Sequence, residues 1–411
     1  FLLFQSVFLL AQYPMDWIDI GFSSASGWLS SHLPEVWWSD LLINGVVAGL
    51  SGILVFIPQI MILFGLITLL EDTGYMARIS FLTDRLMRSA GLNGKSVMPL
   101  ISGFACAVPA IMSARNIENK KERLLTILVT PLISCSARLP VYTILIGIVI
   151  PNTYVFGFIG IQGLVMMGLY LLGSVMALVV SYIAKWFIHI KEKSFFILEL
   201  PTYRAPRWNN VLHTMIHKAK IFVTDAGKVI MVISLILWAL STFGPSGKMN
   251  AVESNYAAAK AGKQASDDKM SADYNNAKLE ASYAGIMGKS IEPLIEPLGY
   301  DWRIGIALIT SFAAREVFVG TMATLYSVGE DQEGVRLRDK MKAAKRPDGT
   351  VLFTLAAGVS LMIFYVFAMQ CMSTLAITRR ETKSWKWPVI QFVYMTALAY
   401  VMSLIAYQLL K

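Results

Sequence analysis

Charged residues are scarce in this chain. Only 15% of its 411 residues are Asp, Glu, Lys or Arg, whereas 55% are hydrophobic. A soluble domain usually carries about 25% charged residues. The charged residues that are present cluster between long uncharged runs, which argues against a soluble fold. The pattern predicts an all-α polytopic membrane protein with about eight transmembrane segments.

Cysteine is also scarce. The chain has three cysteines, Cys106, Cys135 and Cys371, and each lies within an apolar run rather than in a polar loop. This placement argues against a disulfide framework. Two interpretations remain open at this point. The thiols could be small buried hydrophobic groups, or they could be soft metal ligands.

The sequence has no complete nucleotide-binding loop. Gly94-Lys95-Ser96 matches the end of a phosphate-binding loop, but the full motif needs Gly where Ser89 stands. Gly288-Lys289-Ser290 fails in the same way, with Tyr283 in the Gly position. The net charge of +9 comes without a nucleic-acid-binding module, and Lys and Arg in a membrane protein report topology. We therefore predict no nucleotide site and no nucleic-acid partner.

The first unusual segment runs from Val97 to Arg115. It is apolar enough to enter a membrane, but Pro99, Gly103 and Pro109 interrupt it around Cys106. Lipid cannot satisfy the backbone groups that such interruptions release, so the segment must pack in protein or line a wet cavity. Transporters place their substrate sites at broken segments of this kind. A proline-kinked helix with a structural cysteine is the alternative.

Ionisable residues mark two further segments. Arg138 lies near the middle of the apolar run from Leu124 to Pro151, which also contains Cys135. Arg315 and Glu316 lie together in the run from Ile304 to Gly329. Charges inside a membrane segment are costly and usually serve function or pair with a partner. The alternatives are an Arg138 side chain that reaches an interface, and a purely structural ion pair at 315–316.

The order of segments suggests a repeat. A span, a broken segment, a Cys-bearing span and a further span occur twice, and this predicts two gate segments in inverted repeats. We divide the chain into a partial first transmembrane segment with an extracytoplasmic amphipathic connection, a first gate repeat, a cytoplasmic amphipathic arm, and a second gate repeat with an extracytoplasmic insertion at 245–292. These four parts cover residues 1–40, 41–190, 191–227 and 228–411.

Long ordered motifs resemble a known family. They include G-F-A-C-A-V-P-A-I-M-S-A-R, S-C-S-A-R-L-P-V-Y and A-R-E-V-F-V-G-T-M-A-T-L-Y. From about Tyr13 to the C-terminus, outside the insertion, the chain resembles the FeoB family of bacterial ferrous-iron transporters. The resemblance implies a multi-pass protein of the bacterial inner membrane with Gate segments at 97–115 and 304–329. The family usually carries an N-terminal GTPase domain that this sequence lacks, so we expect a membrane domain without enzyme activity.

The resemblance also implies site residues. Its pore cysteines match Cys106, Cys135 and Cys371, whereas the family's frequent Asn after the first of them is Ala107 here. Fe²⁺ accepts thiolate, thioether and carboxylate ligands, so a mixed shell is expected along its path. The predicted metal or pore residues are Cys106, Cys135, Cys371, Met112, Met322 and Glu316; the charge partners are Arg138 and Arg315; weaker candidates are Glu71, Asp72, Gln370 and Met369.

The implied partners are membrane lipid, a GTPase domain of the same or another chain, a small FeoA-like cytoplasmic regulator and a second copy of this chain. The transported cargo is Fe²⁺. Two other functions stay open. One is a two-gate permease for another divalent metal or a nucleoside, although a nucleoside site would favour amides and carboxylates over three sulfurs. The other is a non-transporting membrane receptor, in which these cysteines would be dispensable.

Overall fold

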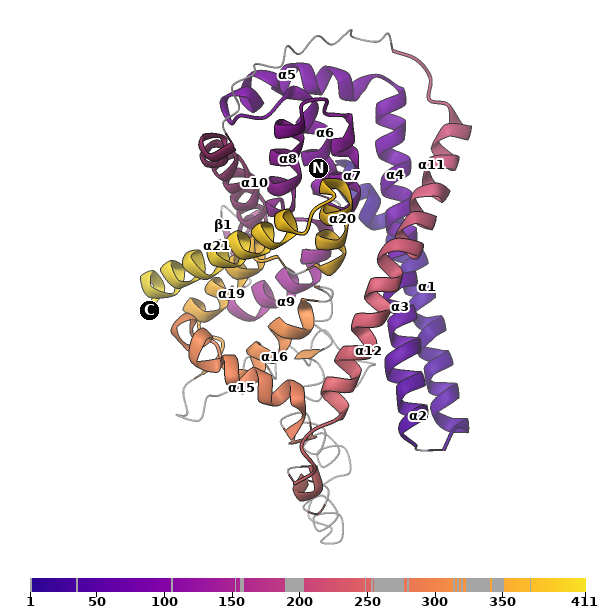
Figure 1. Cartoon of the computed structure of the whole chain (residues 1–411), viewed down its shortest axis with the longest axis vertical. Coiled ribbons are helices and arrows are strands. Elements are labelled where there is room, and N and C mark those ends of the chain that lie inside the picture. Colours follow the sequence, from indigo (N-terminus) through magenta and orange to yellow (C-terminus); the bar gives the residue numbers. More distant parts are fainter. Residues whose placement is uncertain are drawn as a thin grey trace. The chain divides into compact units, whose positions relative to one another are not determined.

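The computed structural model is built from helices and one short β-hairpin (Figure 1). It describes residues 2–34, 36–104, 106–151, 153–155, 159–188, 203–247, 249–252, 254, 277–278, 281–312, 315, 318, 321–322, 341, 351–369 and 371–411. The hairpin pairs β1 (Tyr154–Val155) with β2 (Ile159–Gly160) in antiparallel register, Tyr154 opposite Gly160.

The helices of the first half, in chain order, are α1 (Leu2–His32), α2 (Trp37–Asp40), η1 (Leu41–Val47, a π-helix), α3 (Ala48–Leu54), α4 (Phe56–Asp72), α5 (Tyr75–Ser89), η2 (Gly94–Ser96), α6 (Val97–Gly103), α7 (Ala107–Ser113), η3 (Ala114–Asn116), α8 (Lys120–Val129), η4 (Thr130–Leu132), η5 (Ser136–Arg138), α9 (Leu139–Val149) and α10 (Ile161–Ile188). Those of the second half are α11 (Trp208–Ile221), η6 (Phe222–Gly227, a π-helix), α12 (Lys228–Thr242), α15 (Tyr283–Ile295), η7 (Glu296–Leu298), α16 (Trp302–Ser311), α19 (Leu355–Phe367), α20 (Met372–Thr382) and α21 (Lys386–Leu410).

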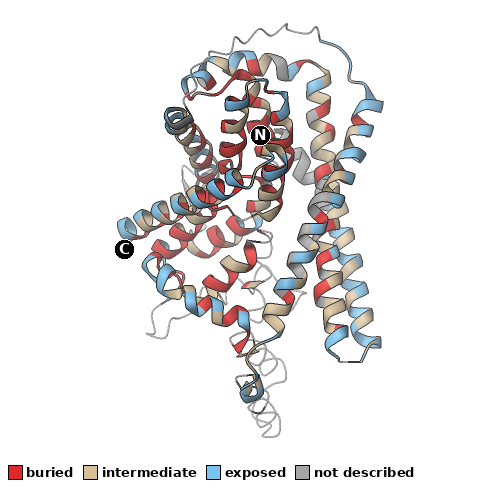
Figure 2. Cartoon of the chain, viewed as in Figure 1, coloured by how far each residue is buried: buried red, intermediate tan, exposed pale blue. Residues whose placement is uncertain are grey.

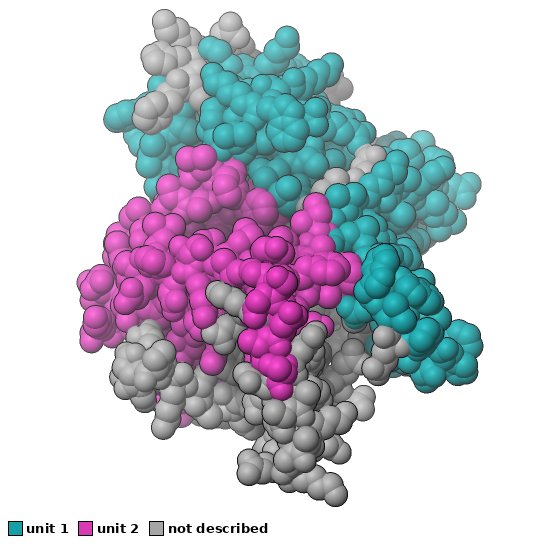
Figure 3. Space-filling view, turned by 60° about the horizontal axis from the view of Figure 1, so that its bottom comes forward, with its two compact units in different colours: residues 1–136, 174–235, 372–391 teal, residues 137–173, 236–371, 392–411 magenta. Residues whose placement is uncertain are grey.

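The chain forms two compact units (Figure 3). Unit 1 comprises Phe1–Ser136, Ser174–Leu235 and Met372–Gln391; unit 2 comprises Ala137–Gly173, Ile236–Cys371 and Phe392–Lys411. The chain leaves unit 1 directly after Ser136 and leaves unit 2 directly after Cys371. Each unit therefore draws segments from both of the predicted repeats, rather than corresponding to one of them.

Long apolar helices support a membrane protein. Among the described residues, three segments are long and apolar enough to cross a membrane: Ile161–Trp186, Leu355–Thr382 and Lys386–Leu410. Helix α10 exposes an apolar stripe of Leu164, Leu171, Val175 and Val179. Figure 2 colours exposed residues pale blue. Such a face suits lipid rather than water. The predicted helical membrane protein is confirmed, whereas the number of about eight spans remains a prediction.

Unit 1 is built around α4, which packs against α1 and α11. A Cβ on Gly65 would lie 2.8 Å from the sulfur of Met215, so the glycine lets α11 approach closely. At the end of α4, Asn210 Nδ2 donates to Asp72 Oδ1 at 3.0 Å. Helix α5 then turns away at Gly74 and lies crosswise to α4 (Figure 1). These contacts tie α4 to the segment that follows residue 202.

The structure gives helix bounds within three of the predicted parts. Helix α1 continues through Pro14 to His32, within the part predicted for residues 1–40. Helices α11, η6 and α12 follow one another without a gap, so residues 208–227 of the predicted arm are helical and continue directly into α12. Helix α15 begins at Tyr283, inside the predicted insertion at 245–292, and packs on α16.

Unit 2 has a core of closely packed helices. Helix α19 lies against α9, and a Cβ on Gly358 would overlap the side chain of Val149. On the opposite side of α19, Ser360 and Ser403 exchange hydroxyl-to-carbonyl hydrogen bonds at 3.1 and 3.0 Å, which join α19 to α21. Small residues at these positions let the helix backbones come close, as is usual in membrane proteins.

Candidate functional site

All three cysteines lie at helix breaks. Cys106 separates α6 from α7, Cys135 separates η4 from η5 and α9, and Cys371 separates α19 from α20. Each thiol therefore stands just before the start of a new helical segment. The backbone at such a point is not fully paired within one helix, so its polar groups need partners from elsewhere.

The first break lies between Gly103 and Ala107. Cys106 has extended backbone angles (φ −155°, ψ 133°), and its N–H donates to the Ser102 carbonyl at 3.1 Å. Pro109 lies in the first turn of α7, where a proline loses no helical hydrogen bond. Its ring is incompatible with a helical carbonyl four residues earlier, which explains why α6 cannot continue into α7. Pro109 thus causes the break but lies inside the following helix.

The second break lies beside the first within unit 1. A Cβ on Gly103 would lie 3.4 Å from Thr130 Cγ2 and 3.6 Å from Ile133 Cβ, so the end of α6 approaches η4 directly. Ile133 is extended, and Ser134 and Cys135 are buried. Pro140 lies in the first turn of α9, as Pro109 does in α7. The Cys106 and Cys135 breaks are therefore neighbouring features of one unit.

Unit 2 contains a comparable pair. Helix α16 ends at Ser311, and α19 ends at Phe367 with Ala368 in an extended conformation. The buried Arg315 Nη2 donates to the Ala368 carbonyl at 3.3 Å. Nearby, Tyr365 donates its hydroxyl to Ser311 Oγ at 3.1 Å. Arg315, predicted as a charge partner, thus links a residue just after α16 to the helix end that precedes Cys371.

The other predicted residues have varied surroundings. Met112 is buried in an apolar cluster with Val108, Ile111 and Ile377, against which Cys106 packs. Met322, Met369 and Arg138 are buried within unit 2. Glu71 is exposed and Asp72 binds Asn210 at the end of α4, so neither lies at one of these breaks. Glu316 and Gln370 lie outside the described residues.

No conventional metal centre is present in the part of the chain that the structure describes. There, no group of three or more His, Cys, Asp or Glu side chains is placed to hold a metal ion. His213 and His217 stack on α11 with ring centroids 6.1 Å apart, and both are exposed. The cysteines and carbonyls of the breaks are therefore the described groups with the best chemistry for a soft cation.

The helices that follow Cys106 and Cys371 pack together. Ile377 of α20 enters the apolar cluster of α7, and Arg115 forms a two-pronged ion pair with Glu381 (Nε–Oε2 2.6 Å, Nη2–Oε1 2.5 Å). The Glu381 side chain is only 7% exposed. Sequence analysis missed Glu381, because its partner is 266 positions away.

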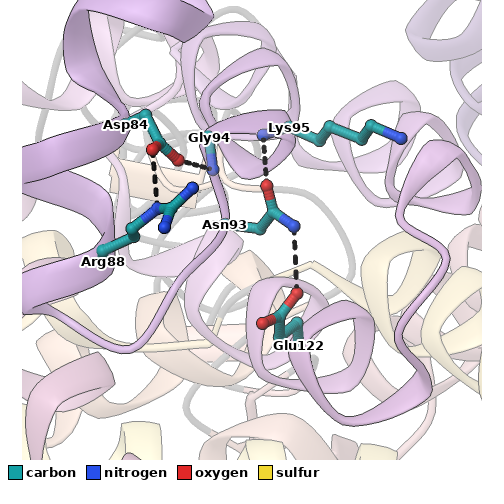
Figure 4. Close-up of polar contacts among 6 residues, drawn as sticks. All are labelled: Asp84, Arg88, Asn93, Gly94, Lys95 and Glu122. Carbon is teal, nitrogen blue, oxygen red and sulfur yellow. Dashed lines mark hydrogen bonds and ion pairs between the residues drawn. The ribbon is translucent and has the colours of Figure 1, made fainter. Parts of the chain in front are cut away.

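A polar network fixes the loop that leads into α6 (Figure 4). Asp84 accepts from the Gly94 N–H at 3.0 Å and pairs with Arg88 at 2.6 Å. Asn93 Nδ2 donates to Glu122 Oε2 at 3.2 Å. Burial raises the pKa of the Glu122 carboxyl; the Asn93 hydrogen bond and Arg88 oppose this shift, and Asp84 adds to it. The network holds the start of the first broken segment against α8.

Glu122→Gln is expected to stabilise the protein at neutral pH. The unfolded chain releases the Glu122 proton near its ordinary pKa of 4.5, whereas the folded chain holds it to higher pH. Wild-type stability therefore falls as pH rises from 4.5 through the raised pKa. A glutamine keeps the acceptor for Asn93 without that loss. Thermal unfolding in detergent from pH 4 to 8 should show a difference that grows with pH; a constant difference would contradict the assignment.

Comparison with known protein families agrees with this architecture. A family model described as "Gate: Nucleoside recognition" matches residues 53–149 and 223–385, which is more than half of the chain. A second, described as "Ferrous iron transport protein B C terminus", matches residues 166–218. The chain therefore belongs to the Gate family of membrane proteins.

Curated relatives give a more particular match. The chain is 44% identical to the Fe(2+) transporter FeoB of Leptospira biflexa over 411 residues, covering 100% of this chain and 56% of the relative. It is 38% identical to the Fe(2+) transporter FeoB of Staphylococcus aureus strain N315 over 414 residues, covering 99% and 55%. It is 35% identical to an Fe(2+) transport protein A/Fe(2+) transporter FeoB fusion protein of Porphyromonas gingivalis over 419 residues, covering 100% and 49%.

The resemblance to FeoB proteins is thus confirmed. The chain spans about half the length of the curated relatives it matches. No solved structure matches the chain.

Proposed function

We propose that this chain forms the membrane pathway of a ferrous-iron importer. The observation that carries the proposal is the position of all three cysteines at helix breaks. Relatives named Fe(2+) transporter FeoB, which match the whole chain, support Fe²⁺ as the cargo. In this proposal the segments 97–115 and 304–329 act as gates, and the cysteines lie along the path of the ion.

The chemistry of a break suits a cation in transit. Helices α6, α8 and α19 each end close to a cysteine, and the carboxyl end of a helix carries partial negative charge. Fe²⁺ is intermediate in softness and accepts both sulfur and oxygen ligands. A few such ligands at each point would bind the ion weakly enough for release. Met322, Met369 and Glu316 remain proposed contributors, whereas the apolar surroundings of Met112 favour a packing role.

The proposal extends to location and partners. We place the protein in the bacterial inner membrane as a multi-pass chain whose repeats have inverted topology. A GTPase domain, of the same or another chain, would control the gates. The Porphyromonas gingivalis relative, a fusion of Fe(2+) transport protein A with FeoB, supports a small FeoA-like partner. Homo-oligomerisation remains part of the proposal.

A nucleoside permease is the second candidate, because the matching family model is described as nucleoside recognition. The three cysteines favour the metal. A nucleoside would be recognised through amides and carboxylates, whereas the described breaks carry thiols, hydroxyls and backbone carbonyls. The two candidates differ in their expected competitors: unlabelled Fe²⁺ for an iron permease, and nucleosides for a nucleoside permease.

The decisive experiment measures uptake of ⁵⁵Fe²⁺ into reducing proteoliposomes that contain the protein, with Mn²⁺, Zn²⁺ and nucleosides as competitors. We expect uptake that excess unlabelled Fe²⁺ suppresses and nucleosides leave unchanged. Suppression by Mn²⁺ or Zn²⁺ at equal concentration would favour a general divalent-metal permease. Uptake of a labelled nucleoside without Fe²⁺ uptake would overturn the proposal. If neither Fe²⁺ nor a nucleoside is transported when the GTPase domain is supplied, the result would favour a non-transporting membrane receptor.

A further inference from the structure

The end of α8 has a backbone carbonyl that its own helix cannot satisfy. In an α-helix the Ile127 carbonyl would accept from the N–H four residues later, but that residue is Pro131, which has no N–H. The helix changes to η4 at Thr130, just before the Cys135 break. The Ile127 carbonyl lies in a buried region, where an unsatisfied polar group is costly. A donor from another helix would offset this cost.

Gln391 of α21 supplies that donor. Its Nε2 donates to the Ile127 carbonyl at 3.0 Å and lies 3.1 Å from the Leu128 carbonyl. Its Oε1 accepts from the Thr378 hydroxyl of α20 at 2.9 Å. Gln391 and Thr378 are both fully buried. One amide therefore joins α8, α20 and α21 within unit 1, at carbonyls seven and eight residues before Cys135.

In unit 2, a different side chain donates to a carbonyl at a helix end. Helix α19 leads into the Cys371 break, and Arg315 donates to the carbonyl of Ala368 at its end. In both units, the helix that leads into a cysteine break has a terminal carbonyl that is satisfied by a side chain from a distant part of the sequence. One break in each unit therefore has a contact of this kind.

We propose that Gln391 is a positioning residue that holds the end of α8 and thereby fixes the backbone that presents Cys135. The carbonyls of Ile127 and Leu128 cannot move without breaking hydrogen bonds to Gln391. Thr378 in turn fixes the orientation of the amide, so that its NH₂ group faces the carbonyls. Any role of Gln391 in transport rests on the proposed function. The effect of Gln391 on the exposure of the Cys135 thiol does not.

The test measures the alkylation rate of Cys135 by a small membrane-permeant thiol reagent. A parent with Cys106→Ser and Cys371→Ser leaves Cys135 as its single thiol. Adding Gln391→Leu keeps a side chain of similar size but removes the amide NH₂ group that donates to the carbonyls. We expect the rate to rise about tenfold, because the break opens locally when its carbonyls lose their partner. Thr378→Val should raise the rate in the same direction, but by less.

Ser403→Ala is the matched control. Ser403 is also fully buried on α21 and also bonds a neighbouring helix, but its partner is Ser360 rather than the Cys135 break. The Ser403→Ala substitution should leave the alkylation rate of Cys135 unchanged. Thermal unfolding tests whether each variant is folded. The proposal is overturned if Gln391→Leu leaves the rate within about twofold of the parent, or if Ser403→Ala raises it equally. Neither result requires transport, so failure of the proposed function would be seen separately in Fe²⁺ uptake.

Discussion

Cys106→Ser should lower the initial rate of Fe²⁺ uptake at least tenfold, about 1.4 kcal/mol or more in the transport barrier. The thiol is half-buried, and its backbone is extended between two short helices. Serine has nearly the same shape but offers a harder oxygen, which remains protonated at neutral pH and binds Fe²⁺ less well than a thiolate does. The measurement is ⁵⁵Fe²⁺ uptake into proteoliposomes at several Fe²⁺ concentrations.

Met112→Leu provides the control for Cys106. Met112 lies one to two turns further along α7, in the apolar cluster that Cys106 contacts. Leucine conserves its volume and apolar character, so stability should change by less than about 1.5 kcal/mol and uptake by less than about twofold. If Met112→Leu lowers uptake as strongly as Cys106→Ser, the thioether is a ligand and our assignment of packing is wrong. If neither variant lowers uptake, the Cys106 break is not on the path.

Gly358→Ala should destabilise the protein by about 1–3 kcal/mol, as overpacking of a close helix contact does. The added Cβ would overlap the side chain of Val149, which lies on α9 across from α19. The helices would have to separate or Val149 would have to leave its favoured rotamer. Adding Val149→Ala should recover a large part of the loss, because it removes the colliding methyl groups. Thermal unfolding of the single and double variants in detergent measures both effects.

Gly168→Ala is the comparison for this experiment. Gly168 also lies in a long apolar helix, α10, but a Cβ there would have nothing within 4 Å. It should be neutral or slightly stabilising, because alanine favours a helix over glycine. Equal destabilisation by both substitutions would mean that helix flexibility, rather than the contact between α9 and α19, determines the result.

Prolines made part of the site predictable. Pro109, Pro131 and Pro140 indicated interrupted helices, and the structure has breaks just before Pro109 and Pro140. The break at Cys371 has no such signal, since the segment from Leu355 to Thr382 contains no proline. There the helix ends where Ala368 becomes extended, with its carbonyl bound by Arg315. A break that depends on a distant side chain cannot be recognised from its own residues.

Long-range contacts explain features of the structure that could not be predicted from the sequence. Gln391 lies 264 positions from Ile127, and a glutamine in an apolar run gives no hint of its partner. Met112 fits a ligand shell by its chemistry, and only the three-dimensional structure shows its apolar neighbours. Residues 208–227 are polar enough to suggest a surface arm, yet they continue directly into α12. Composition predicted the environment of these segments less well than it predicted the class of the protein.

The contact between α7 and α20 has a mechanical consequence. Each helix is the short arm that follows a cysteine, and the two are joined by an apolar cluster and, near their far ends, by the ion pair of Arg115 and Glu381. A displacement of α7 alone would break the Arg115–Glu381 ion pair and open the apolar cluster. We therefore expect α7 and α20 to move together, which would couple the backbone after Cys106 to the backbone after Cys371.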